Sequence, residues 1–204
     1  MTREPLTKSR VQTPPPLAAF RYSAIVRGMW TSLVFSSFLL VQAPDFGPSQ
    51  GMFDELQSAE TQEEAGKVAK DIWDAWMESG SAAADLVMAR AVEAQAQGNP
   101  ALARALYDRV IAIQPGYAEA WNRRATLFLA DENYPEALRD VNEALRLEPR
   151  HFRAWAGLGA VLESLGAQEE AMTAYRRALD LYPLFPAARR ALDQLEQAAE
   201  GRPV

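Results

Sequence analysis

Residues 118–183 read AEAWNRRATLFLADENYPEALRDVNEALRLEPRHFRAWAGLGAVLESLGAQEEAMTAYRRALDLYP. This stretch decides the fold of the 204-residue chain, because it repeats itself at an interval of 34 residues. Trp121 returns as Trp155 at this interval, and Ala137 returns as Ala171. A fixed interval in this range indicates stacked units of two helices each. The same interval relates further positions, which are Ala103, Tyr107, Pro115, Ala144, Pro149, Tyr175, Ala178 and Pro183.

The repeated letters follow the pattern W-x2-L-G-x2-Y…A-x3-F…P. The later unit matches it with Trp155, Leu158, Gly159 and Leu162, then Ala171, Tyr175 and Pro183. The earlier unit matches with Trp121, Ala125 and Phe128, then Ala137, Val141 and Pro149. In these residues the chain resembles the tetratricopeptide repeat (TPR) family. The resemblance implies an all-α, right-handed α-solenoid of helix-turn-helix units.

The interval also predicts the organisation of the chain. We expect about three clear repeats, preceded by a degenerate repeat or a capping pair and followed by a capping helix. The unit 84–117 matches least well, since Val87 stands where the later units have Trp. The predicted segments are a leader over 1–43, a linker over 44–51, the degenerate repeat or capping helices over 52–83, repeats over 84–117, 118–151 and 152–185, a capping helix over 186–199 and a tail over 200–204.

Residue size along each unit fits closely crossing helices. Ala125, Gly159, Ala137, Ala171, Ala144 and Ala178 are small and fall where helices approach, whereas Trp121, Trp155, Tyr107 and Tyr175 are large and fill the core. The turns carry helix stops and caps, as in Gly98-Asn99-Pro100. Arg124 stands where an apolar residue is expected, so we predict that its stem packs and its head reaches solvent.

The N-terminal region is typical of an exported protein. Residues 28–41 are apolar and uncharged, and this length suits the apolar part of a signal peptide with Arg27 just before it. Val41 and Ala43 predict cleavage after Ala43. An uncleaved membrane anchor over 28–43 is the main alternative. A mitochondrial transit peptide or a buried core helix fits the flanking prolines less well.

Composition excludes several classes of function. The chain has no cysteine and one histidine, His151, so we expect no metal site, no cofactor and no catalytic constellation. His151 is predicted to be a surface or helix-start residue. Net charge is −6, and residues 44–204 carry sixteen basic and twenty-six acidic side chains, which disfavours nucleic acid as a partner. An enzyme or a small-molecule binding module is the third and weakest alternative.

The family resemblance further implies a concave groove lined by the first helix of each repeat, where a peptide or a partner helix binds. On that analogy the groove residues are Asp85, Met88, Val92, Gln95, Glu119, Asn122, Arg123, Thr126, Arg153, Ala156, Ala160, Glu163 and Arg190. Met88, Val92 and Gly157 stand where chaperone-binding members clamp a terminal carboxylate, so that clamp is not predicted.

Taken together, these patterns predict a non-enzymatic protein–protein interaction scaffold. The groove is expected to hold an apolar segment with one acidic or carbonyl group. The export-like leader predicts a cell-envelope location, most simply the bacterial periplasm. The alternative is a membrane-anchored adaptor that touches the membrane only through residues 28–43.

Overall fold

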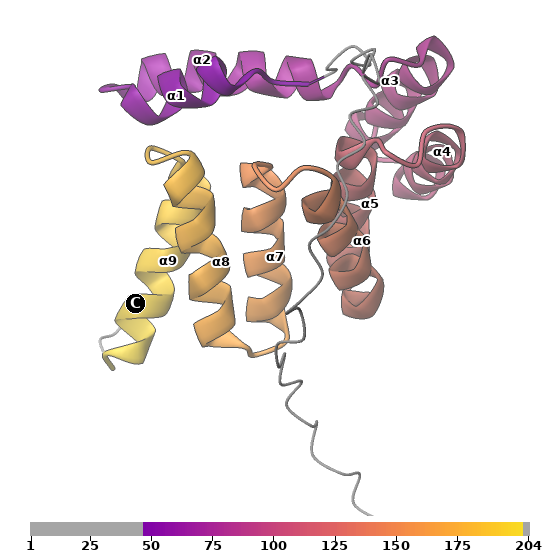
Figure 1. Cartoon of the computed structure of the whole chain (residues 1–204). Coiled ribbons are helices and arrows are strands. Elements are labelled where there is room, and N and C mark those ends of the chain that lie inside the picture. Colours follow the sequence, from indigo (N-terminus) through magenta and orange to yellow (C-terminus); the bar gives the residue numbers. More distant parts are fainter. Residues whose placement is uncertain (1–46, 202–204) are drawn as a thin grey trace, which may run out of the picture. The chain divides into compact units, whose positions relative to one another are not determined.

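The computed structural model describes residues 47–201, and every regular element in that range is a helix (Figure 1). The predicted all-α fold is confirmed. The leader over 1–43 lies outside the described residues, as do residues 202–204 of the tail. In chain order the helices are α1 (Gln50–Ser58), α2 (Gln62–Trp76), α3 (Ala82–Ala96), α4 (Pro100–Ile113), α5 (Ala118–Ala130), α6 (Tyr134–Leu147), α7 (Phe152–Ser164), α8 (Gln168–Leu181) and α9 (Pro186–Ala199).

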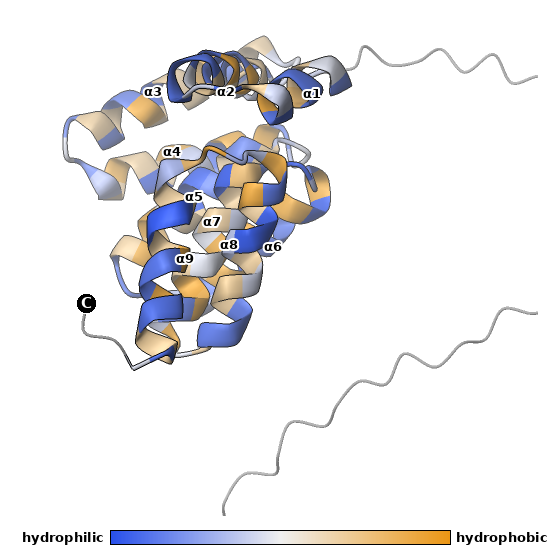
Figure 2. Cartoon of the chain, turned by 90° about the vertical axis from the view of Figure 1, so that its left-hand side faces the viewer, coloured by the Kyte–Doolittle hydropathy of each residue, from blue (hydrophilic) through white to orange (hydrophobic). Residues whose placement is uncertain are grey.

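Six of these helices form three hairpins, in which α3 pairs with α4, α5 with α6, and α7 with α8. Each hairpin then packs on the next, since α4 contacts α5 and α6 contacts α7. The last hairpin is covered by α9, which buries Ala188, Leu192 and Leu195 against α8. The exposed side of α9 is hydrophilic, as Figure 2 shows. A stack of this kind shares one continuous core between neighbours.

The interval of 34 residues corresponds to hydrogen bonds that recur. The indole N–H of Trp121 donates to the carbonyl of Pro115 at 2.9 Å, and Trp155 donates to Pro149 at the same distance. Each tryptophan therefore closes the turn that precedes its own hairpin.

Turns inside the hairpins use a left-handed residue. Gly98 and Gly166 have φ of 73° and 76°, values at which glycine carries no steric penalty. After Gly98, the side chain of Asn99 accepts a hydrogen bond from the Leu102 N–H and caps α4. The middle hairpin has Glu132 at the same repeat position, with φ of 56°. A glutamate in this region costs conformational energy that glycine avoids.

The environment of Arg124 differs from the prediction. Its guanidinium does not reach freely into solvent but binds Asp140 through two hydrogen bonds of 2.6 and 2.9 Å. Asp140 is fully buried, and a third contact joins Arg124 to Asp108 at 2.7 Å. The arginine also lies over the Trp121 ring, with 4.9 Å between its Cζ and the ring centroid. The polar residue at this position thus bonds α5 to α4 and α6.

The helix pair α1–α2 lies across the edge of the stack where the loops between hairpins meet (Figure 1). Its apolar residues share a core with the end of α8 and the start of α7. On the polar side, Gln57 donates to the Asp180 carbonyl at 3.2 Å and Gln62 to the Leu184 carbonyl at 2.8 Å. The sequence left open whether 52–83 is a degenerate repeat or a capping pair. In the structure the pair packs on the α7–α8 hairpin and on the turn into α9. The shared core contains Phe53, Leu56, Ile72, Trp76, Phe152, Leu181 and Tyr182.

Gly159 packs closely against the ring of Tyr175. A Cβ atom here would stand 2.7 Å from the ring of Tyr175, whose hydroxyl is held by Glu163 at 2.9 Å. We expect Gly159→Ala to lower the free energy of unfolding by about 1–3 kcal/mol. Gly157→Ala is the matched control two residues away, where the new Cβ meets only Val141 at 3.8 Å. Urea denaturation followed by circular dichroism measures both, and equal stability of the two variants would contradict the packing argument.

Candidate functional site: the groove face and the edge covered by α2

The predicted groove residues divide into a buried and an accessible set. Met88, Glu119 and Asn122 are buried in this structure and out of reach of a partner, while Asp85 is half-buried and bonded to Ser79. The accessible residues lie on α3, α5, α7 and α9, and the surface that they form is called the groove face below. The groove face comprises Val92, Gln95, Arg123, Thr126, Arg153, Ala156, Ala160, Glu163 and Arg190.

Two groove residues also serve the hairpins themselves. The hydroxyl of Tyr107 donates to Gln95 Oε1 at 2.8 Å, and the hydroxyl of Tyr175 donates to Glu163 Oε2 at 2.9 Å. Both bonds join the first helix of a hairpin to the second at equivalent repeat positions. Gln95 and Glu163 therefore have structural partners, whatever else they bind.

A shallow apolar slot lies between α5 and α7. Its floor is Ala125, Val141 and Val161, and its rim includes Thr126 and Gly157. The slot is narrow, with a free volume of about 10 Å³, so a partner would pack over it rather than insert a side chain into it. Thr126 is exposed, and its hydroxyl donates to the carbonyl of Asn122 in the same helix at 3.0 Å. The slot is the most apolar part of the groove face between these two helices.

Glu119 is the most connected side chain at the edge of the groove, although it is only 1% exposed. Oε1 accepts from Arg123 Nε at 2.8 Å and from the indole of Trp73 at 3.2 Å. Oε2 accepts from Asn122 at 2.9 Å and lies 2.9 Å from His151 Nε2. Burial would raise the pKa of Glu119, but these hydrogen bonds and the Arg123 charge outweigh it and lower the pKa to about 2.

His151 caps the start of α7, in agreement with the predicted helix-start position, but it is buried rather than on the surface. Its Nδ1 accepts from the Ala154 N–H at 3.2 Å, which leaves Nε2 to carry the proton and donate to Glu119. The ring stacks on Trp76 with centroids 4.0 Å apart and planes 5° apart. One histidine thus caps α7, orients Glu119 and supports α2.

Trp73 of α2 lies against the groove residues. The guanidinium carbons of Arg123 and Arg153 stand 5.4 and 5.7 Å from its ring centroid. Together with its bond to Glu119, these contacts place α2 at the end of the groove face nearest to the loops. The sequence placed Trp73 on an apolar stripe, but it carried no signal for these partners, which lie 46 or more residues away.

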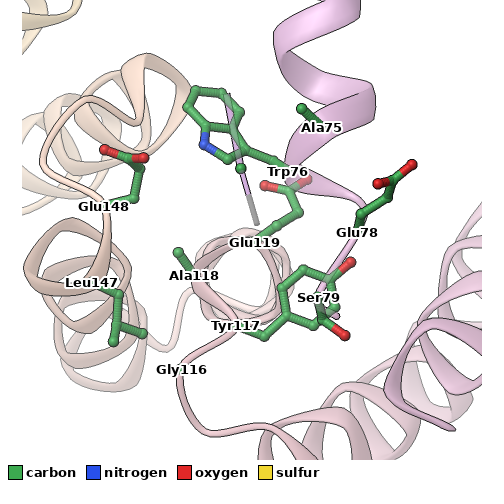
Figure 3. A pocket seen from close by; sticks show the side chains of 11 residues that line it. Ala75, Trp76, Glu78, Ser79, Gly116, Tyr117, Ala118, Glu119, Leu147 and Glu148 are labelled. Carbon is green, nitrogen blue, oxygen red and sulfur yellow. The ribbon is translucent and has the colours of Figure 1, made fainter. Parts of the chain in front are cut away.

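A small pocket opens beside this edge (Figure 3). Its volume is about 120 Å³, and Trp76, Tyr117, Glu119 and Glu148 contribute to its lining. The indole nitrogen of Trp76 is buried and has no hydrogen-bond partner among the described residues. A space of this size holds several water molecules, which is enough to satisfy one indole N–H.

Residues 47–201 show neither a metal-binding cluster nor a membrane-spanning helix. Within residues 47–201 no group of three His, Asp or Glu side chains is placed to hold a metal ion. None of the helices in that range has the length and apolar character needed to cross a membrane.

Stacked helical hairpins with a groove on their first helices define a class of repeat protein, and the comparisons with known proteins identify it. The family model described as tetratricopeptide repeat matches residues 88–142 and 122–186. A TPR repeat-containing protein of Rhizobium etli is 39% identical over 150 residues, which cover 73% of this chain and 72% of the relative. The chain belongs to the tetratricopeptide repeat proteins.

More distant relatives match only about half of this chain. The small glutamine-rich tetratricopeptide repeat-containing protein 2 of Saccharomyces cerevisiae is 30% identical over 100 residues, which cover 46% of this chain and 29% of the relative. The first TPR domain of Spaghetti (RPAP3), bound to the HSP90 peptide SRMEEVD, is 25% identical with a TM-score of 0.55 and covers 57% of this chain and 93% of that domain. The second TPR domain of human RPAP3, in complex with the HSP70 peptide SGPTIEEVD, is 26% identical with a TM-score of 0.51 and covers 54% and 92%.

The Glu119 network predicts a pH dependence of stability. The folded-state pKa of Glu119 lies below its ordinary value of 4.5, so its contribution is complete above pH 4.5 and is lost as the pH falls toward 2. We expect this contribution to be on the order of 3 kcal/mol. Urea unfolding between pH 7 and pH 2 measures it, with Glu119→Gln as the comparison because the amide does not titrate. Stability curves that fall in parallel for both proteins would refute the assignment.

Proposed function

We propose that this protein is a non-enzymatic adaptor that binds a peptide or a helix of a partner protein on its groove face. The observation that carries the proposal is the slot between α5 and α7, which is apolar, accessible and rimmed by small residues. Solved TPR domains of the same fold hold peptides, and this supports peptide binding here. TPR proteins act in general as protein-interaction scaffolds, so no catalytic group is needed.

The surroundings of the slot suggest what the partner offers. An apolar group of the partner would pack over the slot, and Arg123, on the same helix as Thr126, would offer its guanidinium to a carboxylate or a carbonyl. Met88 is fully buried and out of reach, so the first hairpin offers Val92 here, an apolar contact rather than a charged clamp. The partner segment is therefore an amphipathic one.

The proposed location is the cell envelope, through the signal-like segment that ends at Ala43. These residues lie outside the described structure, so the support comes from the sequence alone: the apolar run 28–41 with Arg27 before it. The second candidate keeps 28–43 as a membrane anchor. The mass of the mature protein from its native host, together with cell fractionation, separates the two. A soluble protein starting at Pro44 favours export, and an intact N-terminus in the membrane fraction favours the anchor.

The groove is tested by filling the slot from its rim. Thr126→Arg places a long side chain over the slot, and we expect it to reduce partner recovery at least about tenfold in affinity purification from the native host. Thr173→Arg on α8 is the matched control, because Thr173 is also exposed and also donates to the carbonyl four residues earlier, at 3.0 Å. Circular dichroism confirms that both variants fold. Equal recovery by Thr126→Arg and the original protein would reject the groove as the binding site.

A further inference from the structure

Five arginines of the described residues have guanidinium groups that make no ion pair or hydrogen bond there. They are Arg90, Arg109, Arg153, Arg189 and Arg190. Three of the five gather in one place, although residues 44–204 carry ten more acidic than basic side chains. A cluster of unpaired arginines in an otherwise acidic protein forms a local positive potential that attracts anionic groups.

The three clustered arginines line two adjoining pockets between α2, the start of α7 and the turn into α9. One pocket has a volume of about 250 Å³ and includes Arg153. The other has a volume of about 350 Å³ and includes Arg189 and Arg190. Gln62 and Pro186 line both, so the pockets form one continuous surface, called the α2–α9 cleft below.

The cleft has an aromatic wall beside its cations. Tyr182 and Phe185 stack with ring centroids 5.2 Å apart, and Phe152 meets both of them edge-on. Trp73 closes the wall from α2. Aromatic faces next to arginines suit a ligand that alternates apolar and negative groups.

Of the three arginines, Arg153 lies nearest to the aromatic wall and has no ion-pair partner among the described residues. Its side chain is exposed and lies over the Trp73 ring, with 5.7 Å between its Cζ and the ring centroid. Glu119 is already saturated by four donors, two on each oxygen. An incoming carboxylate would supply the counter-charge that no described side chain provides.

We propose that the α2–α9 cleft binds an acidic, extended segment of a partner protein. Aspartate or glutamate side chains would meet Arg153, Arg189 and Arg190 through paired N–H···O bonds, and an apolar side chain would lie on Tyr182 and Phe185. The proposal rests on the adaptor function and adds a charge preference to it. Residues 1–43 of the chain itself are excluded as the occupant, because they carry five basic side chains and one acidic one.

The test is fluorescence anisotropy of the full chain with two synthetic probes. The first is a short labelled peptide in which glutamate alternates with phenylalanine, and the second has glutamine in place of glutamate. We expect the glutamate peptide to bind at least about tenfold more tightly, with affinity that falls as salt is raised. The triple variant R153Q/R189Q/R190Q should lose this preference.

Two further variants keep the test specific. R189Q/R190Q changes only exposed residues of α9 and should weaken the glutamate peptide several-fold even if Arg153 supports the position of Trp73. R90Q/R109Q removes the same charge from unpaired arginines on α3 and α4, outside the cleft, and should change affinity less than about twofold. An equal loss in R90Q/R109Q, or equal binding of both peptides, overturns the proposal.

The remaining outcomes separate this inference from the adaptor function. If the cleft instead holds a second copy of the chain, light scattering will show self-association that R189Q/R190Q abolishes, and the proposal fails. If partner recovery depends on Thr126 while neither peptide distinguishes the arginine variants, the adaptor function stands and the acidic segment is rejected. If the glutamate peptide binds as expected while Thr126→Arg recovers its partner normally, the slot between α5 and α7 is rejected as the binding site and the cleft remains.

Discussion

The arrangement at the edge of the groove depends on one buried negative charge. Glu119 accepts hydrogen bonds from α2, from its own helix α5 and from His151 at the start of α7. A carboxylate without these partners would be costly to bury, since an isolated charge loses its hydration. Each donor is in turn held by packing, as in the stack of His151 on Trp76. The charge therefore fixes where α2 lies relative to two hairpins, which apolar packing alone specifies less strictly.

Much of the hairpin stack could be predicted because the interval of 34 residues reflects a repeated physical unit. Tryptophan and proline recur together because the indole N–H of one binds the carbonyl of the other. Gly98 and Gly166 recur because the turn needs a positive φ. The middle hairpin has Glu132 at this position, also with a positive φ. Because glutamate rarely adopts this conformation, the sequence did not predict the left-handed backbone there.

Contacts between distant segments could not be predicted from the same pattern. Periodicity showed which side of α2 is apolar, but the partners of that side lie in α7 and α8. The guanidinium of Arg124 was expected in solvent. Its partner Asp140 is buried, and the sequence of a single repeat does not distinguish a buried carboxylate from an exposed one. The groove residues Met88, Glu119 and Asn122 were named by analogy, and the position of α2 and the local packing decide that they are covered.

The position of α1–α2 also changes how the chain must assemble. An array of hairpins has mainly local contacts, but Gln57 meets Asp180 across 123 residues, which raises the contact order. During synthesis at roughly 5–20 residues per second, α1 would wait roughly 6–25 s for its partner to leave the ribosome. Trp76 can pack on Phe53 at once, but its contacts with His151 and Phe152 wait until the start of α7 has been made. The N-terminal helices therefore complete their native contacts only when the C-terminal part of the chain has been made.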